Sequence, residues 1–158
     1  MEFTAPGQLD RLCEILPLRD ACDEPRHRNA VAPDVEDSAA AQVRVDPQQI
    51  KQVLINLIRN AADSIGQNGA ITLRVRLGAK RLADGPTEVV ILEVADTGKG
   101  IPPEVQKRLF DPFFTTKEDG TGLGLSIAAR IVEKHGGVLQ YQTQVNRGTV
   151  FGIVLPRA

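Results

Sequence analysis

The sequence predicts a small α+β domain: a two-layer α/β sandwich with a mixed, mostly antiparallel sheet covered on one face by helices. Two long segments, residues 47–65 and 123–135, carry apolar residues at helical spacing. Four further segments carry alternating or continuous apolar residues that are typical of strands. The strands follow one another as pairs while the helices stand apart, and this order favours helices packed on one face of a sheet.

The composition suits one globular domain, with 158 residues of which 42% are hydrophobic and 25% charged. We expect residues 1–42 to form an N-terminal helix and entry segment, and residues 43–158 to form the core of the same domain. The opening "MEF" is consistent with a cloning scar, so we expect the chain to be a fragment of a longer protein, with any membrane anchor or sensor outside these residues.

The charge and the apolar pattern exclude several classes of partner. A formal net charge of -1 gives no general attraction for nucleic acid or for an anionic membrane. No apolar run approaches the ~20 residues that cross a bilayer, so we expect no membrane contact by this fragment. Cys13 and Cys22 are the only cysteines, and we interpret them as reduced thiols in a cytoplasmic compartment.

The first half of the chain predicts two helices. Residues 7–21 have leucine and isoleucine at helical spacing up to Pro17, and residues 23–42 read as a loop with one short edge strand. Asp46 is a good N-cap for the main helix, which starts at Pro47 and ends at "GQNG". Its apolar face comprises Ile50, Val53, Leu54, Leu57, Ile58, Ala61 and Ile65.

The second half predicts the sheet and one more helix. Residues 70–77 alternate like a half-buried strand, residues 88–96 are nearly all apolar like a central strand, and "GAKRLADGPT" connects them. A short helix is expected at 103–110, and a terminal hairpin turns at "VNRG". The second long helix should face inward with Ile127, Ala128, Ile131 and Val132.

Two asparagines share one edge of the main helix. Asn56 and Asn60 are spaced i, i+4, so their side chains lie one turn apart. An amide oxygen at such a position suits a hard cation such as Mg²⁺, which prefers oxygen ligands together with phosphate and water. Without other motifs, solvated or capping amides are the preferred explanation of the pair.

A second candidate site follows the central strand, in "VADTGKGIP". Asp96 ends the strand, and an ionised carboxylate only accepts hydrogen bonds, so it suits the exocyclic amine of adenine. Gly98 and Gly100 allow backbone to approach a flat ring closely or to move as a hinge. The alternative is an ordinary Asx turn that leaves a strand.

A third candidate is "DPFFTTKEDGTGLGLSI" at residues 111–127. Gly120, Gly122 and Gly124 lie near a helix N-terminus, where free N–H groups favour phosphate, and Lys117 adds a positive charge. Phenylalanines at 110, 113 and 114 would pin a mobile loop or dock it on a partner. The alternative is a glycine-rich surface loop over a small satellite core.

In this order, Asn60, "DTGKGI", "LFDPFFTTK", "GTGLGL" and the "GT" of residues 148–149 resemble one family. It is the catalytic ATP-binding domain of two-component sensor histidine kinases, in the GHKL superfamily that includes gyrase and a heat-shock chaperone. The likeness covers about residues 43–156, and "LINLIRNAADSI" looks most similar to the nitrogen-regulation branch.

The resemblance implies a role for each motif. Asn60 would hold Mg²⁺ with Asn56 beside it, Asp96 would read adenine with Thr149 in support, and residues 98–122 would form the lid over ATP. The catalytic set would be Asn56, Asn60 and Lys117. The nucleotide-binding set would be Asn60, Asp96, Gly98, Gly100, Ile101, Phe110, Thr116, Lys117, Gly120, Thr121, Gly122, Leu123, Gly124, Leu125 and Thr149.

The implied function is transfer of the γ-phosphoryl group of ATP to a histidine on a separate dimerisation domain, with a response regulator downstream. ATPases of the superfamily resemble one another in a glutamate that acts as base, and Asn56 stands at that position.

Neither His27 nor His135 is a good acceptor. Asp63 stands where many family members have a basic residue, so phosphate would depend more on Arg59 or Lys117. The alternative is a regulatory nucleotide-binding module, such as an anti-sigma-like serine kinase or a docking domain.

Overall fold

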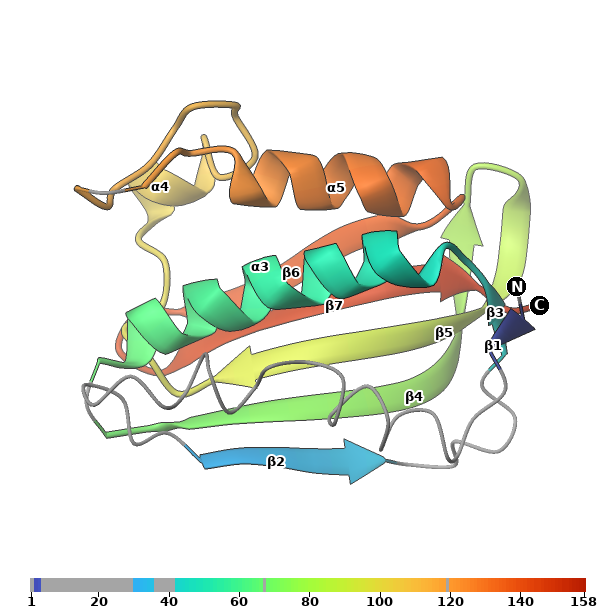
Figure 1. The fold of residues 1–158 in the computed structure, drawn as a ribbon, viewed down its shortest axis with the longest axis horizontal. Helices are drawn as coiled ribbons and strands as arrows, with labels where there is room; N and C mark the ends of the chain where they lie inside the picture. The colour runs from blue at the N-terminus through green and yellow to red at the C-terminus, as the bar shows by residue number, and fades with distance from the viewer. Residues whose placement is uncertain (1, 4–29, 36–41, 67, 119) are drawn as a thin grey trace.

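The computed structural model describes residues 2–3, 30–35, 42–66, 68–118 and 120–158. The expected helix at 7–21 and both cysteines lie outside these residues. In Figure 1 the described part forms two layers, with helices α3 and α5 lying over one face of a sheet. The predicted α+β sandwich is confirmed.

The main sheet has five strands in the order β2-β4-β5-β7-β6. Its edge strand β2 (Ala30–Val35) runs parallel to β4, and the other neighbours are antiparallel, so the sheet is mixed as expected. The other members are β4 (Ala70–Leu82), β5 (Gly85–Asp96), β6 (Val138–Gln144) and β7 (Gly148–Pro156). Two short strands, β1 (Glu2–Phe3) and β3 (Val43–Arg44), pair separately.

Helix α3 (Pro47–Ile65) carries most of the core, and its start follows the sequence prediction. The Asp46 side chain accepts hydrogen bonds from the backbone N–H groups of Gln48 and Gln49. These bonds satisfy two N–H groups that have no partner within the helix. Along the apolar face, Val53 and Leu57 are fully buried against the sheet. The cap and the buried face together fix both the start and the rotation of the helix.

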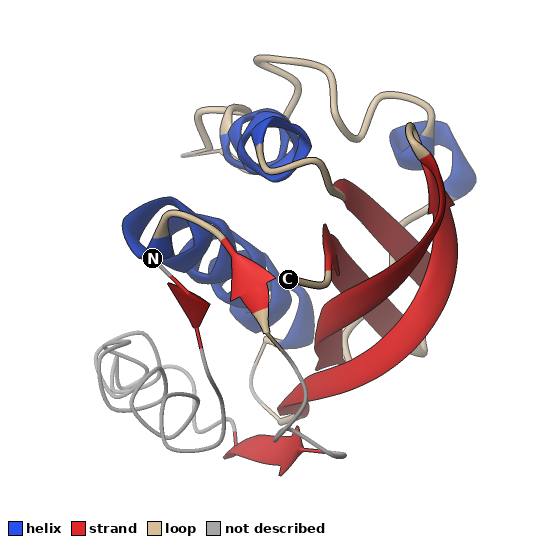
Figure 2. Cartoon of the chain, turned by 90° about the vertical axis from the view of Figure 1, so that its right-hand side faces the viewer, coloured by secondary structure: helices blue, strands red, loops and turns tan. Residues whose placement is uncertain are grey.

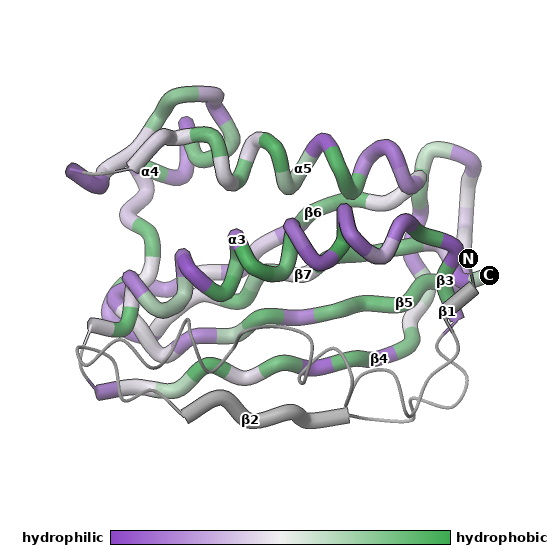
Figure 3. The backbone as a smooth tube through the Cα atoms, in the orientation of Figure 1, coloured by the Kyte–Doolittle hydropathy of each residue, from purple (hydrophilic) through white to green (hydrophobic). Residues whose placement is uncertain are grey.

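Strand β5 is buried on both faces, which explains its nearly continuous apolar sequence. Val90 and Val94 belong to the core beneath the helices, whereas Val89 and Ile91 pack with Val154 on the opposite face. Figure 3 shows hydrophobic residues along most of this strand, between β4 and β7. Figure 2 shows how strongly the sheet curves around the helical layer.

Two expectations about element length were wrong. The predicted connection at 78–87 is mostly strand, because β4 and β5 continue as one hairpin until Leu82 pairs with Gly85. The tip of this hairpin is largely exposed, so its polar residues lack the alternation that marks a half-buried strand. The helix expected at 103–110 is shorter, since α4 covers only Pro103–Gln106.

Helix α5 (Gly124–Lys134) packs on α3 and on the sheet through Ala128 and Val132, which are fully buried. Ile127 was predicted to face inward as well, and this was wrong because its side chain is 42% exposed. The helix is covered on one side only, so its buried stripe is narrower than the apolar stripe in the sequence.

Truncation of Leu57 should cost about 2–5 kcal/mol of unfolding free energy, because Leu57→Ala leaves a cavity under the centre of α3. Urea denaturation would measure this loss. Gln48→Ala, at an exposed position of the same helix, is the control and should stay within about 0.5 kcal/mol. A similar loss for both variants would contradict the central role of this face.

Candidate functional site

Asp96 ends β5 beside Thr149 of β7, and both side chains are buried, at 8% and 3% exposure. Burial raises the pKa of the Asp96 carboxyl, although hydrogen bonds from Gly98, Thr149 and Ser64 oppose this shift. One of these bonds joins the Gly98 N–H to Asp96 Oδ1 at 2.8 Å. A buried carboxylate accepts hydrogen bonds and cannot donate them, so it suits a ligand that donates one.

The turn after Asp96 packs directly on the C-terminal end of α3, and only glycine fits at its centre. A Cβ on Gly98 would lie 2.2 Å from Ser64 Oγ and 2.6 Å from the Ser64 carbonyl carbon. The Lys99 N–H donates to the Ser64 carbonyl at 3.2 Å. Since Ser64 follows Asn60 by one helical turn, this contact places Asp96 and Asn60 at the same end of the two layers.

Thr143, which the sequence analysis missed, connects the start of the predicted lid to Thr149. Thr143 Oγ1 accepts from the Ile101 N–H at 2.9 Å and lies 2.9 Å from Thr149 Oγ1. Ile101 follows Gly100, whose φ is +70°. The signal was present in the "VNRG" turn, because hairpin pairing around it sets Thr143 opposite Thr149. The hydroxyl of Thr143 therefore ties the start of the lid to the predicted adenine-supporting residue.

Asn56 and Asn60 lie one helical turn apart but have different hydrogen-bond partners. Asn56 Nδ2 donates to the Gly124 carbonyl at 3.2 Å and thereby fastens the start of α5 to α3. Asn60 Oδ1 instead accepts from the Lys117 ammonium of the lid at 2.9 Å. The amide oxygen of Asn60 is thus accessible to a cation, as a metal ligand must be. Among the described residues no group of three or more His, Cys, Asp or Glu could hold a metal.

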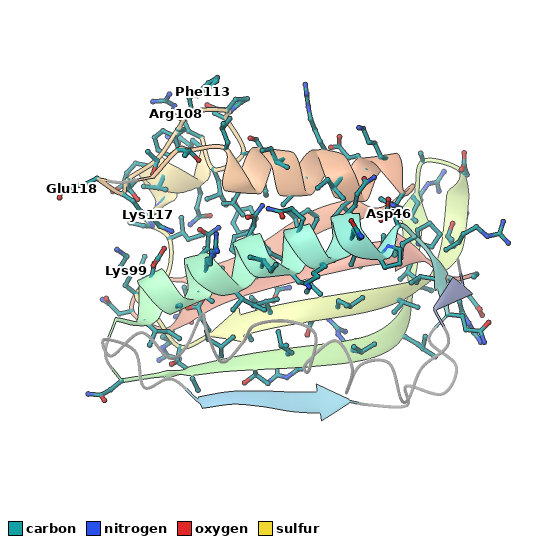
Figure 4. The ribbon with its side chains drawn as sticks, viewed as in Figure 1. Asp46, Lys99, Arg108, Phe113, Lys117 and Glu118 are labelled. Carbon is teal, nitrogen blue, oxygen red and sulfur yellow. The ribbon has the colours of Figure 1, made fainter. Side chains whose placement is uncertain are left out.

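Asp63 shares Lys117 with Asn60. The Lys117 ammonium forms an ion pair with Asp63 Oδ2 while it donates to Asn60. In Figure 4 the Lys117 side chain extends from the lid toward α3. The sequence flagged Asp63 as a departure from the family pattern, but it could not show that a lid lysine lies against it.

The phenylalanines of the lid have three separate environments. Phe110 packs on the core, with its ring centroid 5.9 Å from that of Tyr141, and the Arg108 guanidinium lies 4.5 Å from the ring centre of Phe114. Phe113 is 76% exposed with φ +65° and stands at the top of Figure 4. Its N–H donates to the Gly122 carbonyl at 2.9 Å. The phenylalanines therefore anchor the lid at Phe110 and leave Phe113 outside.

The remaining predicted residues line the end of the lid. Gly120 donates its N–H to the Lys117 carbonyl, and Thr121 Oγ1 accepts from the Leu123 N–H at 3.4 Å. Leu125 is partly buried against the core, whereas Thr116 is exposed. The structure thus brings Asp96, Gly98, Gly100, Ile101 and Thr149 together, and Asn60 with Lys117.

Comparison with known proteins defines the class. Residues 45–158 match the family described as histidine kinase-, DNA gyrase B-, and HSP90-like ATPase. The chain is 42% identical over 115 residues to sensor histidine kinase ZraS of Salmonella typhi, which covers 73% of this chain and 23% of that protein. The chain therefore spans about a quarter of the length of this curated relative.

Solved structures agree with this class. The catalytic domain of histidine kinase ThkA superposes with a TM-score of 0.75 at 31% identity, covering 99% of this chain and 95% of that one. Full-length ShkA, solved in complex with AMPPNP, gives 0.74 at 27% identity over 99% of this chain and 31% of its own. ThkA is also solved with the response regulator TrrA, at 0.70 and 29% identity, covering 100% of this chain and 42% of that one.

The chain belongs to the histidine kinase-, gyrase B- and HSP90-like ATPase family. Within it, the domain is homologous to the catalytic domains of sensor histidine kinases. No helix among the described residues is long and apolar enough to cross a membrane.

The burial of Asp96 predicts a pH-dependent effect on stability. Because its folded pKa is raised above the ordinary 3.8, ionisation at neutral pH disfavours the folded state. Asp96→Asn should therefore gain unfolding free energy relative to wild type at neutral pH. The gain should shrink as the pH falls through the raised pKa to below 3.8, in a series of urea denaturations. Asp84→Asn, at an exposed turn, should show no such trend, and a gain independent of pH would contradict the assignment.

Proposed function

We propose that this domain binds Mg·ATP and transfers the γ-phosphoryl group to a histidine on a separate dimerisation and phosphoacceptor domain. The proposal depends on one observation: two groups that suit parts of Mg·ATP lie at the same end of the helical layer and the sheet. There the buried carboxylate of Asp96 lies next to Thr149, and the Asn60 amide oxygen already faces a cation. The homologous domains belong to sensor histidine kinases, which favours this role over an anti-sigma-like or docking module.

In this proposal the adenine ring enters beside Gly98. Its exocyclic amine would donate to the Asp96 carboxylate, while Thr149 would support the ring edge. Guanine has a carbonyl in place of that amine, so the carboxylate would repel it. The AMPPNP bound to ShkA is an adenine nucleotide, which supports the choice of base.

The triphosphate would extend toward α3 and the lid. Asn60 would hold Mg²⁺ through its amide oxygen, with phosphate and water oxygens as the other ligands. When bound, the metal neutralises charge on the phosphate oxygens. The Lys117 ammonium lies 2.9 Å from the same amide oxygen, within reach of the outer phosphate. The Gly124 N–H at the start of α5, and the Gly122 N–H just before the helix, would favour the same negative charge.

The transfer step needs position more than acid–base chemistry from this domain. A neutral imidazole nitrogen attacks the γ-phosphorus, a P–N bond forms, the bond to the ADP oxygen breaks, and the imidazole loses its proton to solvent. Asn56 stands where related ATPases have a glutamate that acts as a general base. Its side-chain amide donates a hydrogen bond to the Gly124 carbonyl. Since an amide cannot take a proton from water, hydrolysis of ATP should be slow.

The acceptor histidine would come from outside the described domain. Both ring nitrogens of His135 are engaged, since Nε2 accepts from the Asp46 N–H at 3.0 Å and Nδ1 lies 2.7 Å from the Ile131 carbonyl. A cytoplasmic histidine hairpin and a downstream response regulator complete the proposed pathway. The ThkA complex with TrrA supports a partner of the second kind.

Asp96→Asn should weaken ATP binding about 10- to 100-fold, the loss expected for one hydrogen bond to a charged group. Isothermal titration calorimetry with a non-hydrolysable ATP analogue measures it. Asp84→Asn, which removes an exposed carboxylate at the far hairpin, is the matched control. Equal affinities for wild type and Asp96→Asn would refute the adenine assignment.

Asn60→Ala should abolish Mg²⁺-dependent transfer, because it removes the only protein ligand proposed for the metal. Radiolabelled ATP should label a purified phosphoacceptor hairpin from a related kinase when the wild-type domain is added, and should label the domain itself very little. Asn68→Ala, an exposed asparagine just after α3, should transfer normally. Tight ATP binding without transfer to any matched hairpin would argue for the regulatory alternative.

A further inference from the structure

We propose that Asp63 is a positioning residue that holds the lid lysine, Lys117, until a terminal phosphate displaces it. Asp63 would thereby set how strongly the site prefers ATP over ADP. The inference rests on the proposed function. It assigns a role to the acidic residue that stands where many relatives carry a basic one.

Two oxygens of α3 converge on one lid cation. Asn60 and Asp63 are three residues apart, so their side chains lie on the same face of the helix. Lys117 Nζ contacts Asn60 Oδ1 at 2.9 Å and forms its ion pair with Asp63 Oδ2. A lysine more than fifty residues away in sequence therefore lies where the metal and the outer phosphate are expected.

Two hydrogen-bonded turns order the backbone on both sides of Lys117. The Lys117 N–H donates to Thr115 Oγ1 at 3.1 Å, and its carbonyl accepts from the Gly120 N–H at 3.2 Å. These two short turns bracket the lysine within the lid. By contrast, the neighbouring Glu118 is exposed and points away from α3 in Figure 4.

The ion pair is weak enough to exchange. The side chains of Lys117 and Asp63 are 42% and 50% exposed, and exposed pairs change a population by only about two- to fivefold. A multiply charged terminal phosphate can therefore compete for the ammonium. Mg²⁺ on Asn60 would then restore a positive charge beside Asp63 when the lysine leaves.

ADP and ATP differ in this competition. ATP must separate Lys117 from Asp63 before its terminal phosphate gains the lysine, so part of its binding energy is lost. ADP lacks that phosphate, so the ion pair with Asp63 stays in place even when Mg²⁺ takes the Asn60 oxygen from the lysine. Asp63 consequently weakens the binding of the terminal phosphate and leaves the binding of adenine unchanged.

A double-mutant cycle on Asp63 and Lys117 tests this role. Calorimetry would measure Mg·ATP and Mg·ADP affinities for wild type, Asp63→Asn, Lys117→Gln and the double variant. We expect Asp63→Asn to tighten ATP binding about two- to fivefold. ADP binding should be unchanged, and the gain should vanish in the Lys117→Gln background. Glu118→Gln removes the same charge next to Lys117 and should change neither affinity.

Three results would overturn the inference. Asp63→Asn could raise the affinities for ADP and ATP equally, or could raise the ATP affinity even in the Lys117→Gln background. Either result would mean that Asp63 acts only by repelling the negative charge of the nucleotide. Weaker ATP binding in Asp63→Asn would mean that the carboxylate assists the metal.

Hydrogen exchange gives a second readout without nucleotide. Lid amides near Lys117 should exchange faster in Asp63→Asn than in wild type or Glu118→Gln, and equal rates would overturn the restraint. Failure of the proposed function looks different, because ATP would then bind equally to wild type and Asp96→Asn. If Asp96→Asn weakens binding as expected but the cycle shows no coupling, only the role of Asp63 fails.

Discussion

The burial of α3 against the sheet is the interaction on which the rest of the molecule depends. Val53 and Leu57 are fully buried, so the helix can neither rotate nor slide without exposing them. That constraint fixes the directions of Asn60, Asp63 and Ser64, which lie near the C-terminal end of the same helix. The cation-facing amide, the lysine partner and the contact to Gly98 therefore come from two turns of one rigid element. A site built on such an element needs little reorganisation when a ligand arrives.

Burial on both faces of β5 has a comparable effect on the other half of the site. Because β5 is covered on both faces, its last residue, Asp96, is also largely shielded from solvent. Desolvation raises the pKa of the carboxyl, and the Gly98 N–H opposes the shift by binding Oδ1. The protein thus keeps a buried carboxyl whose desolvation is only partly offset by hydrogen bonds. Burial of this carboxyl therefore costs part of the folding free energy at neutral pH.

The predicted lid is fixed at its two ends and makes exposed polar contacts with α3 between them. Ile101 donates to Thr143 at one end, and Asn56 donates to Gly124 at the other. Between these points Phe110 packs on the core, while Lys117 reaches α3 through exposed contacts. Motion of the middle is therefore compatible with fixed ends, as a segment that opens and closes over a nucleotide requires. Phe113, exposed at φ +65°, offers the largest apolar surface of this segment to the outside.

The sequence alone determined the elements whose signals are local. Spacing and the Asp46 cap predicted α3 to within a residue, the alternation of β4 and the apolar run of β5 predicted the central hairpin, and the motifs predicted the family. Tertiary structure decided everything that depends on what covers a side chain. It left Ile127 exposed and extended β4 through polar residues. It also placed the Asn56 amide in a hydrogen bond to the Gly124 carbonyl. It also paired Lys117 with Asp63 and Thr143 with Thr149. These pairings join residues on different elements, and periodicity within one segment carries no information about contacts between two.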